Sequence, residues 1–447
     1  MNKQKKPNFI SHFFKDFRWL SPGLGIKRWT LVYLFGTMLI GLGFAVIVLD
    51  VYRTSPDTWW LPILSFLSLR FLSRPVRALV FGGLGVALVI LGVVKYNRIL
   101  LKPFMRPGKP IYDTVSEYQK KERGPRVVVL GGGTGLSAML RGLKKYTRNI
   151  TAIVTVADDG GSSGELRRTM GVLPPGDIRN CLAALSNDEE LVSQMFQYRF
   201  ASGAGLNGHT LGNLLITALT DITGSFEEAI AESGRVLAVH GKVLPSTLHD
   251  VKLVADVNLT ENGQEVRIKG ESEIPKAAGQ IQRIWLEPNN PLAYPPTIQA
   301  ILSADLVIIG PGSLFTSIIP NLLVPDIAAA LKSSRAVKFF VCNVATQPGE
   351  TDGFNCGDHV RAIEKYLDGF LFDLLICNDQ CEGQLPEGLD WVCVEEELKN
   401  SYAIYQTDLV DPEKPWRHES EKLASAIMDL FYEKTGPLMP RDGEFNL

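Results

Sequence analysis

The sequence predicts an α/β fold: a Rossmann-like, mostly parallel sheet with helices on both faces and a small antiparallel insertion, preceded by two transmembrane helices. Three observations support this. From residue 125 onward, apolar strand-like runs alternate with segments of helical period, which is typical of a parallel sheet covered by helices. One stretch instead alternates apolar and polar residues around Asn262-Gly263, which predicts a tight hairpin. Two uncharged apolar runs precede residue 95, each near the length that spans a bilayer.

The N-terminal part is expected to be a basic cytoplasmic tail, residues 1–28, and a two-helix transmembrane anchor, residues 29–99. The spans are the uncharged runs 29–49 and 78–94. The second run is slightly short, so a buried helix is the alternative, but its flanking arginine and lysine residues favour the membrane. No charge lies within either run, so we interpret the pair as an anchor that binds the lipid bilayer and not as a transport pathway.

Orientation follows from the basic residues. Lysine and arginine are more frequent in the tail and after the second span than in the loop between the spans. The positive-inside rule therefore predicts a multi-pass protein of the cell membrane whose two termini and main domain are cytoplasmic. The tail is too long, and lacks an obvious small-residue cleavage site, for a removable signal peptide.

Residues 100–124 are polar and charged, with prolines and glycine, and are expected to form a linker or a short helix. Residues 125–447 are expected to form one Rossmann-like domain. Near its end, Leu423, Ile427, Leu430 and Phe431 share one helical face, so the last long helix should pack on the core. The strand-like runs of this domain are residues 126–130, 150–157, 306–310, 337–343 and 370–377.

Residues 251–270, VKLVADVNLTENGQEVRIKG, break this alternation of strands and helices. Apolar and polar residues alternate on both sides of Asn262-Gly263, a dipeptide that favours a two-residue hairpin turn. The stretch predicts an antiparallel β insertion at about residues 243–284. The insertion could be an added sheet or a contact between subunits, and a homo-oligomer is expected.

Composition and cysteine spacing exclude several classes of protein. The 46 basic residues nearly balance the 48 acidic ones, and no basic run with interleaved aromatics follows residue 125, so nucleic-acid binding is not expected. The six cysteines include no CxxC pair and no partnering histidine cluster, so we predict neither a disulfide nor a structural zinc site. These cysteines are Cys181, Cys342, Cys356, Cys377, Cys381 and Cys393.

The strongest functional signal is a glycine-rich turn after the first strand of the domain. The apolar residues 127–130 run into this turn, and the chain then becomes helical. Glycine permits positive φ and lets a ligand approach the backbone, while the first amides of a helix attract an anion. We therefore predict a phosphate-binding turn. Its residues are Gly131, Gly132, Gly133, Thr134 and Gly135.

Two carboxylates, Asp158 and Asp159, end the next strand-like run, at the sheet edge where open α/β folds bind ligands. They could hold Mg²⁺ on a diphosphate, or one could accept a proton from an attacking hydroxyl; the alternative is turn stabilisation and helix capping. A dinucleotide fold carries instead a single acid about 20 residues after the glycines, so a standard NAD dehydrogenase is disfavoured. The residues that follow the pair are Gly160, Gly161, Ser162 and Ser163.

Two polar loops that precede helices supply further candidates. In LPPGDIRN, residues 173–180, Asp177 could cap the helix or bind a ligand, and Arg179 and Asn180 follow it. An arginine in a first helical turn suits a phosphate or carboxylate, although a surface salt bridge is the alternative. In NGHTLGN, residues 207–213, His209 could act as a general acid or as a local hydrogen bonder, and Asn213 could contact a base or sugar.

Two later strand ends have the same character. After the apolar run 306–309, Gly310, Gly312 and Ser313 predict a second anion or ribose site. Asn343 begins another polar loop, VCNVATQPGETDGF, residues 341–354. The sequence contains no GxSxG, no HExxH and no lysine in a Walker-type loop. These loops therefore predict a cleft with many phosphate-compatible donors and few nucleophiles.

The ordered motifs resemble one family. GGGTGLSAMLRGL is followed by TVADDGGSSGELR, LPPGDIRNCLAAL, GHTLGNLLITAL, ADLVIIGPGSLFTSIIPNLLVP and CNVATQPGETDGF. This series is similar to the bacterial gluconeogenesis factor family (YvcK-like), within the superfamily of the archaeal 2-phospho-L-lactate transferase CofD. The resemblance covers residues 126 to about 364. It leaves out the two predicted spans, which the short cytosolic members lack.

The resemblance implies a Rossmann-like domain that binds nucleotide sugars such as UDP-N-acetylglucosamine, and a role in cell shape and cell-wall integrity during growth on gluconeogenic carbon sources. It implies that residues 131–135, 158–163 and 310–313 line the nucleotide site, with His209 and Asn213 nearby. The transferase branch shares the glycine turn and the aspartate pair but is not similar in LPPGDIRN or in the loop after Asp159. A shared phosphate site does not imply shared chemistry.

Three functions remain open. In the first, the domain binds a UDP-sugar and, without turnover, regulates cell-wall precursor supply or a membrane partner such as a cell-wall synthesis protein. The second is a CofD-type transferase that moves a phospho-acyl group from a nucleotide-activated donor to a hydroxyl, with Mg²⁺ as candidate ion and Asp158, Asp159 and His209 as catalytic residues. The third is a structural membrane protein whose domain is an interaction platform. The absence of an obvious nucleophile favours the first.

Overall fold

The computed structural model describes residues 34–39, 41–42, 44–45, 63, 66, 69, 71–101, 121–187, 189–203, 205–259, 263–277, 279–367 and 372–436. The chain divides into two compact units, Met1–Gln119 and Lys120–Leu447, and each is taken by itself. The predicted basic tail lies outside the described residues. The predicted linker does too, except for residues 100–101 and 121–124.

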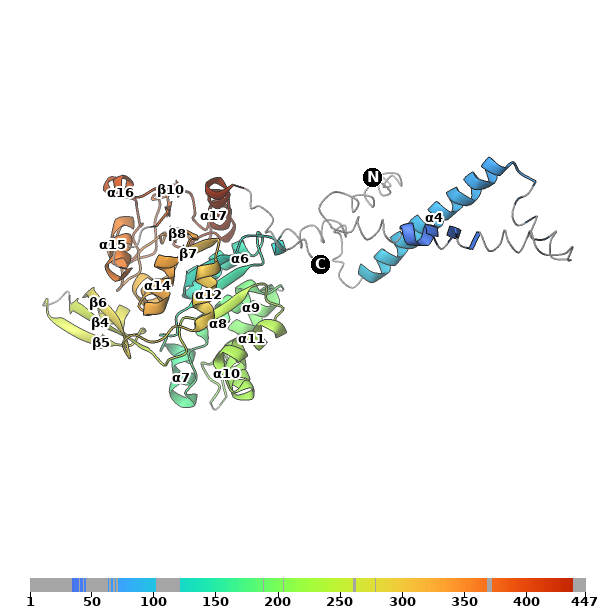
Figure 1. Ribbon diagram of the computed structural model, residues 1–447. Coiled ribbons are helices and arrows are strands. Elements are labelled where there is room, and N and C mark those ends of the chain that lie inside the picture. The colour runs from blue at the N-terminus through green and yellow to red at the C-terminus, as the bar shows by residue number, and fades with distance from the viewer. Residues whose placement is uncertain are drawn as a thin grey trace, which may run out of the picture. The chain divides into compact units, whose positions relative to one another are not determined.

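The first unit has one long apolar helix in its described part. Helix α4, Arg74–Leu101, contains the predicted second span and is blue in Figure 1. Within it, Pro75–Gly92 is long and apolar enough to cross a membrane, and its apolar side chains, such as Leu79, are exposed. Of the predicted first span, only residues 34–39, 41–42 and 44–45 are described, all helical. A pair of spans therefore stays a prediction.

The second unit is built on a seven-stranded sheet in which, over the described residues, all neighbouring strands are parallel. The strand order is β10-β9-β8-β7-β1-β2-β3. Central strands are buried on both faces, which is why they read as unbroken apolar runs. The strands are β1 (Val127–Gly131), β2 (Ile150–Val154), β3 (Lys242–Pro245), β7 (Leu306–Ile309), β8 (Val337–Val341), β9 (Leu374–Asn378) and β10 (Ile404–Thr407).

All five predicted strands belong to this sheet, but its two edges differ from prediction. β3 overlaps the start of the predicted antiparallel insertion, about residues 243–284. It pairs instead in parallel with β2. The edge strand β10 was not predicted because its sequence, IYQT, is short and its middle residues are exposed.

The strand order reverses between β1 and β7. The chain moves outward from β1 to β2 and β3, then places β7 on the other side of β1 and continues outward to β10. The carboxyl ends of β1 and β7 therefore flank a topological switch point, where open α/β sheets bind ligands. The two predicted glycine turns follow these two strands, so the topology brings them together.

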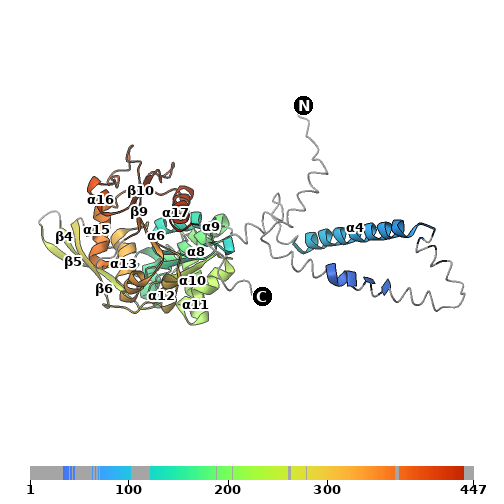
Figure 2. The same cartoon turned by 45° about the horizontal axis from the view of Figure 1, so that its top comes forward.

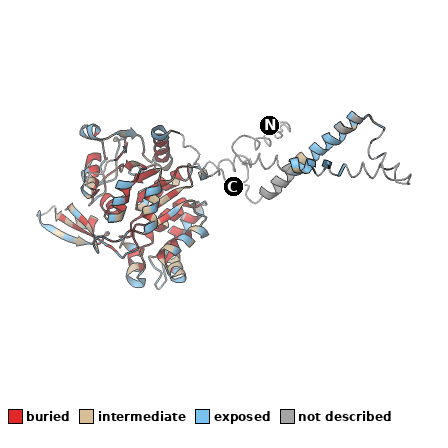
Figure 3. Cartoon of the chain, in the orientation of Figure 1, coloured by how far each residue is buried: buried red, intermediate tan, exposed pale blue. Residues whose placement is uncertain are grey.

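Helices cover both faces of the sheet (Figures 1 and 2). Successive strand residues point to opposite faces of the sheet. On one face, Val127 and Val129 pack in a buried cluster with residues of α6, α8 and α17. On the other face, Val128 and Leu130 pack with residues of α12, α14 and α15. Figure 3 shows this burial in the strands and the helix faces against them. The helices are α6 (Gly133–Leu143), α7 (Gly161–Met170), α8 (Gly176–Leu185), α9 (Glu189–Gln197), α10 (Leu211–Thr223), α11 (Phe226–Val236), α12 (Pro295–Ser303), α13 (Ile319–Leu322), α14 (Pro325–Ser333), α15 (Cys356–Leu367), α16 (Glu396–Ser401) and α17 (Ser420–Thr435).

Helix α17 packs on the core as its periodicity predicts. Leu423, Ile427 and Phe431 are fully buried against the sheet, and Leu430 is partly buried beside them. The prediction of a core-packed final helix is confirmed.

The insertion is a separate three-stranded antiparallel sheet of order β5-β4-β6. β4 (Lys252–Leu259) and β5 (Glu265–Lys269) form the predicted hairpin, with Asn258 opposite Glu265. The Leu259 amide donates to the Gln264 carbonyl at 3.0 Å, so residues 260–263 connect the strands and the expected two-residue turn is wrong. β6 (Gly279–Glu287) pairs on the other side of β4 and extends past the predicted end of the insertion at residue 284. A short 3₁₀ turn, Ile274–Ala277, links β5 to β6.

The prediction of no disulfide is wrong. Cys381, in the loop after β9, and Cys393, before α16, form a disulfide with their Cα atoms 6.4 Å apart. Twelve residues separate them in the sequence, so no short motif marks the pair. The other four cysteines are buried free thiols, consistent with their positions in apolar runs.

Candidate functional site

The glycine turn after β1 lies directly against the Gly310–Pro311–Gly312 turn after β7. A Cβ atom built on Gly135 would lie 3.0 Å from the Pro311 carbonyl oxygen, and one on Gly312 would lie 3.2 Å from the Gly132 carbonyl oxygen. Backbone therefore packs on backbone, with no room for side chains between the turns. Gly133 has φ +66° and Gly310 has φ +79°, in the region that favours glycine. The two predicted anion sites thus form one structure at the switch point.

A cavity of about 450 Å³ opens beside the two turns. Of the predicted site residues, it is lined by Gly132, Gly133, Thr134, Gly135, Gly312, Ser313 and Asn343. Gly131 and Gly310 lie just behind them, at the ends of the strands. The remaining lining residues are Ala138, Pro311, Val344, Ala345, Thr346, Gln347, Pro348, Glu350, Leu389, Trp416, Arg417 and His418.

One wall of this cavity comes from a segment that the sequence analysis missed. Trp416, Arg417 and His418 lie shortly before α17, and Trp416 is 37% exposed. A half-exposed indole offers a surface on which a base can stack, and a neighbouring guanidinium suits a phosphate. The sequence does carry a signal here, because an aromatic and a cationic residue are adjacent in a polar loop. This loop does not directly follow an apolar strand, so the pattern used to find the other loops does not mark it.

Side-chain amides hold the second turn in shape. Asn343 accepts a hydrogen bond from the Gly312 amide at 3.1 Å and donates Nδ2 to the Gly312 carbonyl at 2.8 Å. Gln347 donates to Ser313 Oγ at 2.7 Å, and Asn321 donates to the Gly131 carbonyl at 3.1 Å. Asn343 therefore shapes the turn, and its amide is used within the protein.

A second group of predicted residues forms a polar network at the amino ends of α7, α8 and α10. Arg179 donates to Thr210 Oγ1 at 2.6 Å and to Asn213 Oδ1 at 3.1 Å. It also donates to Asn180 Oδ1 at 2.9 Å. Burial lowers the pKa of Arg179, partly offset by the charge of Asp177. In this structure the Arg179 guanidinium is thus hydrogen-bonded within the protein, and its predicted role toward a phosphate or carboxylate stays a prediction.

Asn213 extends the network to the serines and histidine. Its Nδ2 donates to Ser162 Oγ at 3.1 Å and lies 3.4 Å from Ser163 Oγ. Ser162 Oγ is 3.0 Å from His209 Nδ1, and His209 Nε2 is 3.4 Å from a Glu165 carboxylate oxygen. This chain of groups could carry a proton toward the start of α7. None of these residues lines the cavity beside the glycine turns.

The two aspartates have different roles. Asp158 Oδ1 accepts from the Gly160 amide at 2.8 Å, at the start of α7. Asp159 Oδ1 accepts from the Ser272 amide at 2.9 Å and so ties the antiparallel sheet to the edge of the main sheet. This long-range contact was not predicted, because nothing in the local sequence distinguishes the second aspartate from the first.

Asp158 belongs to a group of carboxyl groups with raised pKa values. Burial, and then the charge of Asp158, raise the pKa of Asp177 to about 6. Burial, and then the charges of Asp158 and Glu350, raise the pKa of Glu271 to about 8, and burial raises the pKa of Glu350 to about 7. Burial is also the main cause of the raised pKa of Asp158. At neutral pH the site therefore retains protons that ordinary carboxylates lose.

Asp177 joins this acidic group to the glycine turn. A Cβ on Gly132 would lie 2.5 Å from Asp177 Oδ2, and Asp177 accepts from the Gly133 amide. Helix α8 begins at Gly176 with no side-chain cap, so the capping role is not observed. Among the described residues, no three histidine, cysteine, aspartate or glutamate side chains gather closely enough to hold a metal ion. Mg²⁺ could be held there only with oxygens from a ligand, as is usual at phosphate sites.

Comparisons with known proteins agree with this arrangement. Residues 127–435 match the family model described as 2-phospho-L-lactate transferase CofD. A putative gluconeogenesis factor of Nostoc sp. is 52% identical over 78% of this chain and 75% of its own, and one of Clostridium acetobutylicum is 40% identical over 92% and 85%. The gluconeogenesis factor of Bacillus subtilis is 44% identical over 69% of this chain and 99% of its own.

A solved structure is similar as well. A crystal structure of a member of the UPF0052 family from Bacillus halodurans superposes with a TM-score of 0.64 at 44% identity, covering 68% of this chain and 99% of that one. The short relatives thus correspond in length to the second unit alone, and the membrane hairpin predicted here is an addition to it.

Proposed function

The chain belongs to the CofD family and is a relative of the gluconeogenesis factors, and from this we propose that its main domain binds a nucleotide sugar, specifically a UDP-sugar, as a regulator without turnover. We further propose that the domain is held at the cytoplasmic face of the cell membrane by two transmembrane helices, and that it supports cell shape and cell-wall integrity during gluconeogenic growth. Its partners would then be proteins of cell-wall synthesis.

The observation that carries this proposal is the cavity beside the two packed glycine turns. Its backbone amides suit a diphosphate, because the first turn opens the helix α6. Trp416 and Arg417 form another wall. A base can stack on the Trp416 indole, and a phosphate oxygen can accept a hydrogen bond from the Arg417 guanidinium. A volume of about 450 Å³ lies within the usual range for pockets that enclose small organic ligands.

The internal hydrogen bonds of the site favour binding over catalysis. Ser162, His209 and Asn213 bond to one another, outside the cavity. The hydroxyl of Ser313 accepts from Gln347. No activated nucleophile therefore lies beside the predicted phosphate position in the described part of the chain.

Calorimetry with UDP-N-acetylglucosamine on the full chain in detergent tests the proposal. Arg417→Ala should weaken binding by about tenfold or more, because it removes a charge-assisted hydrogen bond to phosphate. Among the described residues, the hydrogen bonds of Arg417 are those of its backbone, to Lys414 and Asp411, so the variant should stay folded. Arg168→Ala, an exposed arginine outside the cavity, is the matched control. Absence of binding by the unmodified chain would reject the proposal.

The alternative function is a CofD-type, Mg²⁺-dependent transferase that moves a phospho-acyl group from a nucleotide-activated donor to a hydroxyl acceptor. The raised pKa values of Asp158 and Glu271 favour it, because such a group can accept or donate a proton near neutral pH. Chromatography of nucleotides after incubation with activated donors would detect turnover. Asp158→Asn should then abolish product formation. Asp159→Asn, which changes the side chain that bonds to the Ser272 amide, should retain part of the activity.

A further inference from the structure

A second cavity, of about 510 Å³, lies at the opposite edge of the sheet from the candidate site. It is bounded by the first residues of β1, β2 and β3 and by α12. Because the strands are parallel, their amino ends share one edge while both glycine turns lie at the other. The two cavities share no lining residue.

The floor of this cavity is a row of side chains on one face of the sheet. Val128, Thr151 and Lys242 stand next to one another in register on β1, β2 and β3. Exposure rises along the row, from Val128 at 2% to the half-buried Thr151 and the exposed Lys242. Helix α12 therefore covers the β1 end of the row and leaves the β3 end open to a ligand.

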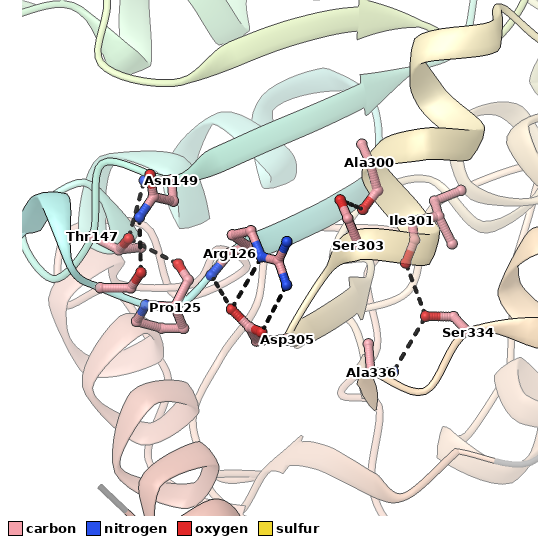
Figure 4. A network of polar contacts seen from close by, with 11 residues as sticks. Pro125, Arg126, Thr147, Asn149, Ala300, Ile301, Ser303, Asp305, Ser334 and Ala336 are labelled. Atoms are coloured by element: carbon pink, nitrogen blue, oxygen red, sulfur yellow. Dashed lines mark hydrogen bonds and ion pairs between the residues drawn. The ribbon is translucent and has the colours of Figure 1, made fainter. Parts of the chain in front are cut away.

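Three cationic side chains line the cavity: Arg126, Arg148 and Lys242. Arg126 is held by Asp305, with 2.8 Å from its backbone nitrogen to Oδ2 and 3.3 Å from Nη2 to Oδ1, next to Ser303 of α12 (Figure 4). Arg148 Nη2 lies 2.7 Å from His240 Nε2 and its Nη1 lies 3.3 Å from a Glu122 oxygen. The two guanidinium groups are thus positioned before any ligand arrives.

Three cationic side chains lie close enough to His240, the neighbour of Arg148, to affect its pKa. Burial lowers the pKa of His240 to about 4, and the charges of Arg148, Lys121 and Lys144 lower it further, against a smaller opposite effect of Glu122. Burial is the largest cause of this shift, and only the smaller contribution of the three cationic charges would also favour an anion nearby.

We propose that this cavity binds the phosphate monoester of a small organic molecule. Arg126, Arg148 and Lys242 contact the phosphate, and the apolar surface of Leu244, Pro296 and Ala300 contacts the carbon skeleton. Arginine forks suit phosphate oxygens, and charge-assisted bonds of this kind are the strong ones. A free metabolite and the headgroup of a phosphate-bearing lipid present the same chemistry. The proposal is independent of the nucleotide-sugar site.

Calorimetry with glycerol 3-phosphate, on the full chain in nanodiscs of phosphatidylcholine, tests this site. Lys242→Glu should weaken binding by about tenfold or more, because repulsion replaces a charge-assisted contact. Lys252→Glu changes an exposed lysine of the other sheet and should have no effect. Ser303→Trp, at another exposed position of the lining, should block the cavity without changing its charge.

Two further arms separate the possible sources of phosphate. If the lipid headgroup occupies the cavity, nanodiscs that also contain phosphatidate should lower the apparent affinity for glycerol 3-phosphate. If the ligand is a free metabolite, phosphatidate should leave this affinity unchanged. Both results support the site. Arg417→Ala should keep glycerol 3-phosphate binding. The proposal fails if the unmodified chain binds no glycerol 3-phosphate in either nanodisc, if Lys242→Glu and Ser303→Trp bind it normally, or if Arg417→Ala abolishes binding.

Discussion

Glu350 shows how single residues set the charge of the cavity beside the glycine turns. Its Oε1 accepts from Thr316 Oγ1 at 3.0 Å, while its buried Oε2 has no hydrogen-bond partner among the residues that the structure describes. A proton on Glu350, which lines the cavity, removes a negative charge that would repel a diphosphate there. The raised pKa is therefore consistent with a site for an anion.

The pKa of Glu350 predicts how stability changes with pH. The native value of about 7 exceeds the ordinary 4.5, so the native state binds the proton more tightly than the unfolded state. The stability that this provides is complete below pH 4.5 and is lost as pH rises to about 7. Glu350→Gln, which stays neutral, should gain stability relative to the unmodified chain between about pH 5 and pH 8, by on the order of 2 to 3 kcal/mol.

Denaturant unfolding at these two pH values measures the effect, with the exposed Glu382→Gln as control. Parallel stability curves for Glu350→Gln and the unmodified chain would show that Glu350 keeps an ordinary pKa in the native state.

At the scale of elements, the contact between the two glycine turns is the most constrained part of the site. Gly135→Ala should push the turns apart, because its Cβ would lie 3.0 Å from Pro311 oxygen and 3.2 Å from the Gly312 nitrogen. We expect UDP-sugar affinity to fall by at least about tenfold, and stability by about 1 to 3 kcal/mol from overpacking.

Gly234→Ala is the matched control, a glycine in helix α11 whose added Cβ meets nothing closer than 3.9 Å. It should leave affinity unchanged and raise stability by about 0.5 to 1 kcal/mol, since alanine favours helix. Calorimetry and unfolding on both variants test the pair. Equal affinities would show that the turns do not form the phosphate site.

Most elements could be predicted because the inner strands are apolar on both faces and end in glycine or polar turns. The half-exposed β10 and the short β3 could not, because an edge strand lacks the unbroken apolar run that marks an inner one. The glycine turns and Asn343 were predicted from the same strand ends. The role of Glu271 and the hydrogen bond from the Ser272 amide to Asp159 could not be predicted. Both depend on how the insertion packs against the main sheet, which local sequence patterns do not encode.

At the scale of the whole molecule, the short relatives predict that the second unit is independent of the anchor. A chain that starts at residue 121 should stay folded and bind UDP-N-acetylglucosamine with the affinity of the full chain. The full chain should sediment with membranes after alkaline washing while the shortened chain stays soluble. Cell fractionation and calorimetry check both points. A soluble full chain would disprove the proposed anchor.

The walls of the cavity beside the glycine turns come from distant parts of the chain. They include the turn after β1, the turn after β7, and Trp416 to His418 shortly before the last helix. During synthesis, the first turn leaves the ribosome long before the last wall exists. A nascent or C-terminally truncated chain therefore has no complete pocket. If a nucleotide sugar binds there, as we propose, it can stabilise only a domain whose translation is finished. Ligand occupancy would then distinguish finished molecules from incomplete ones.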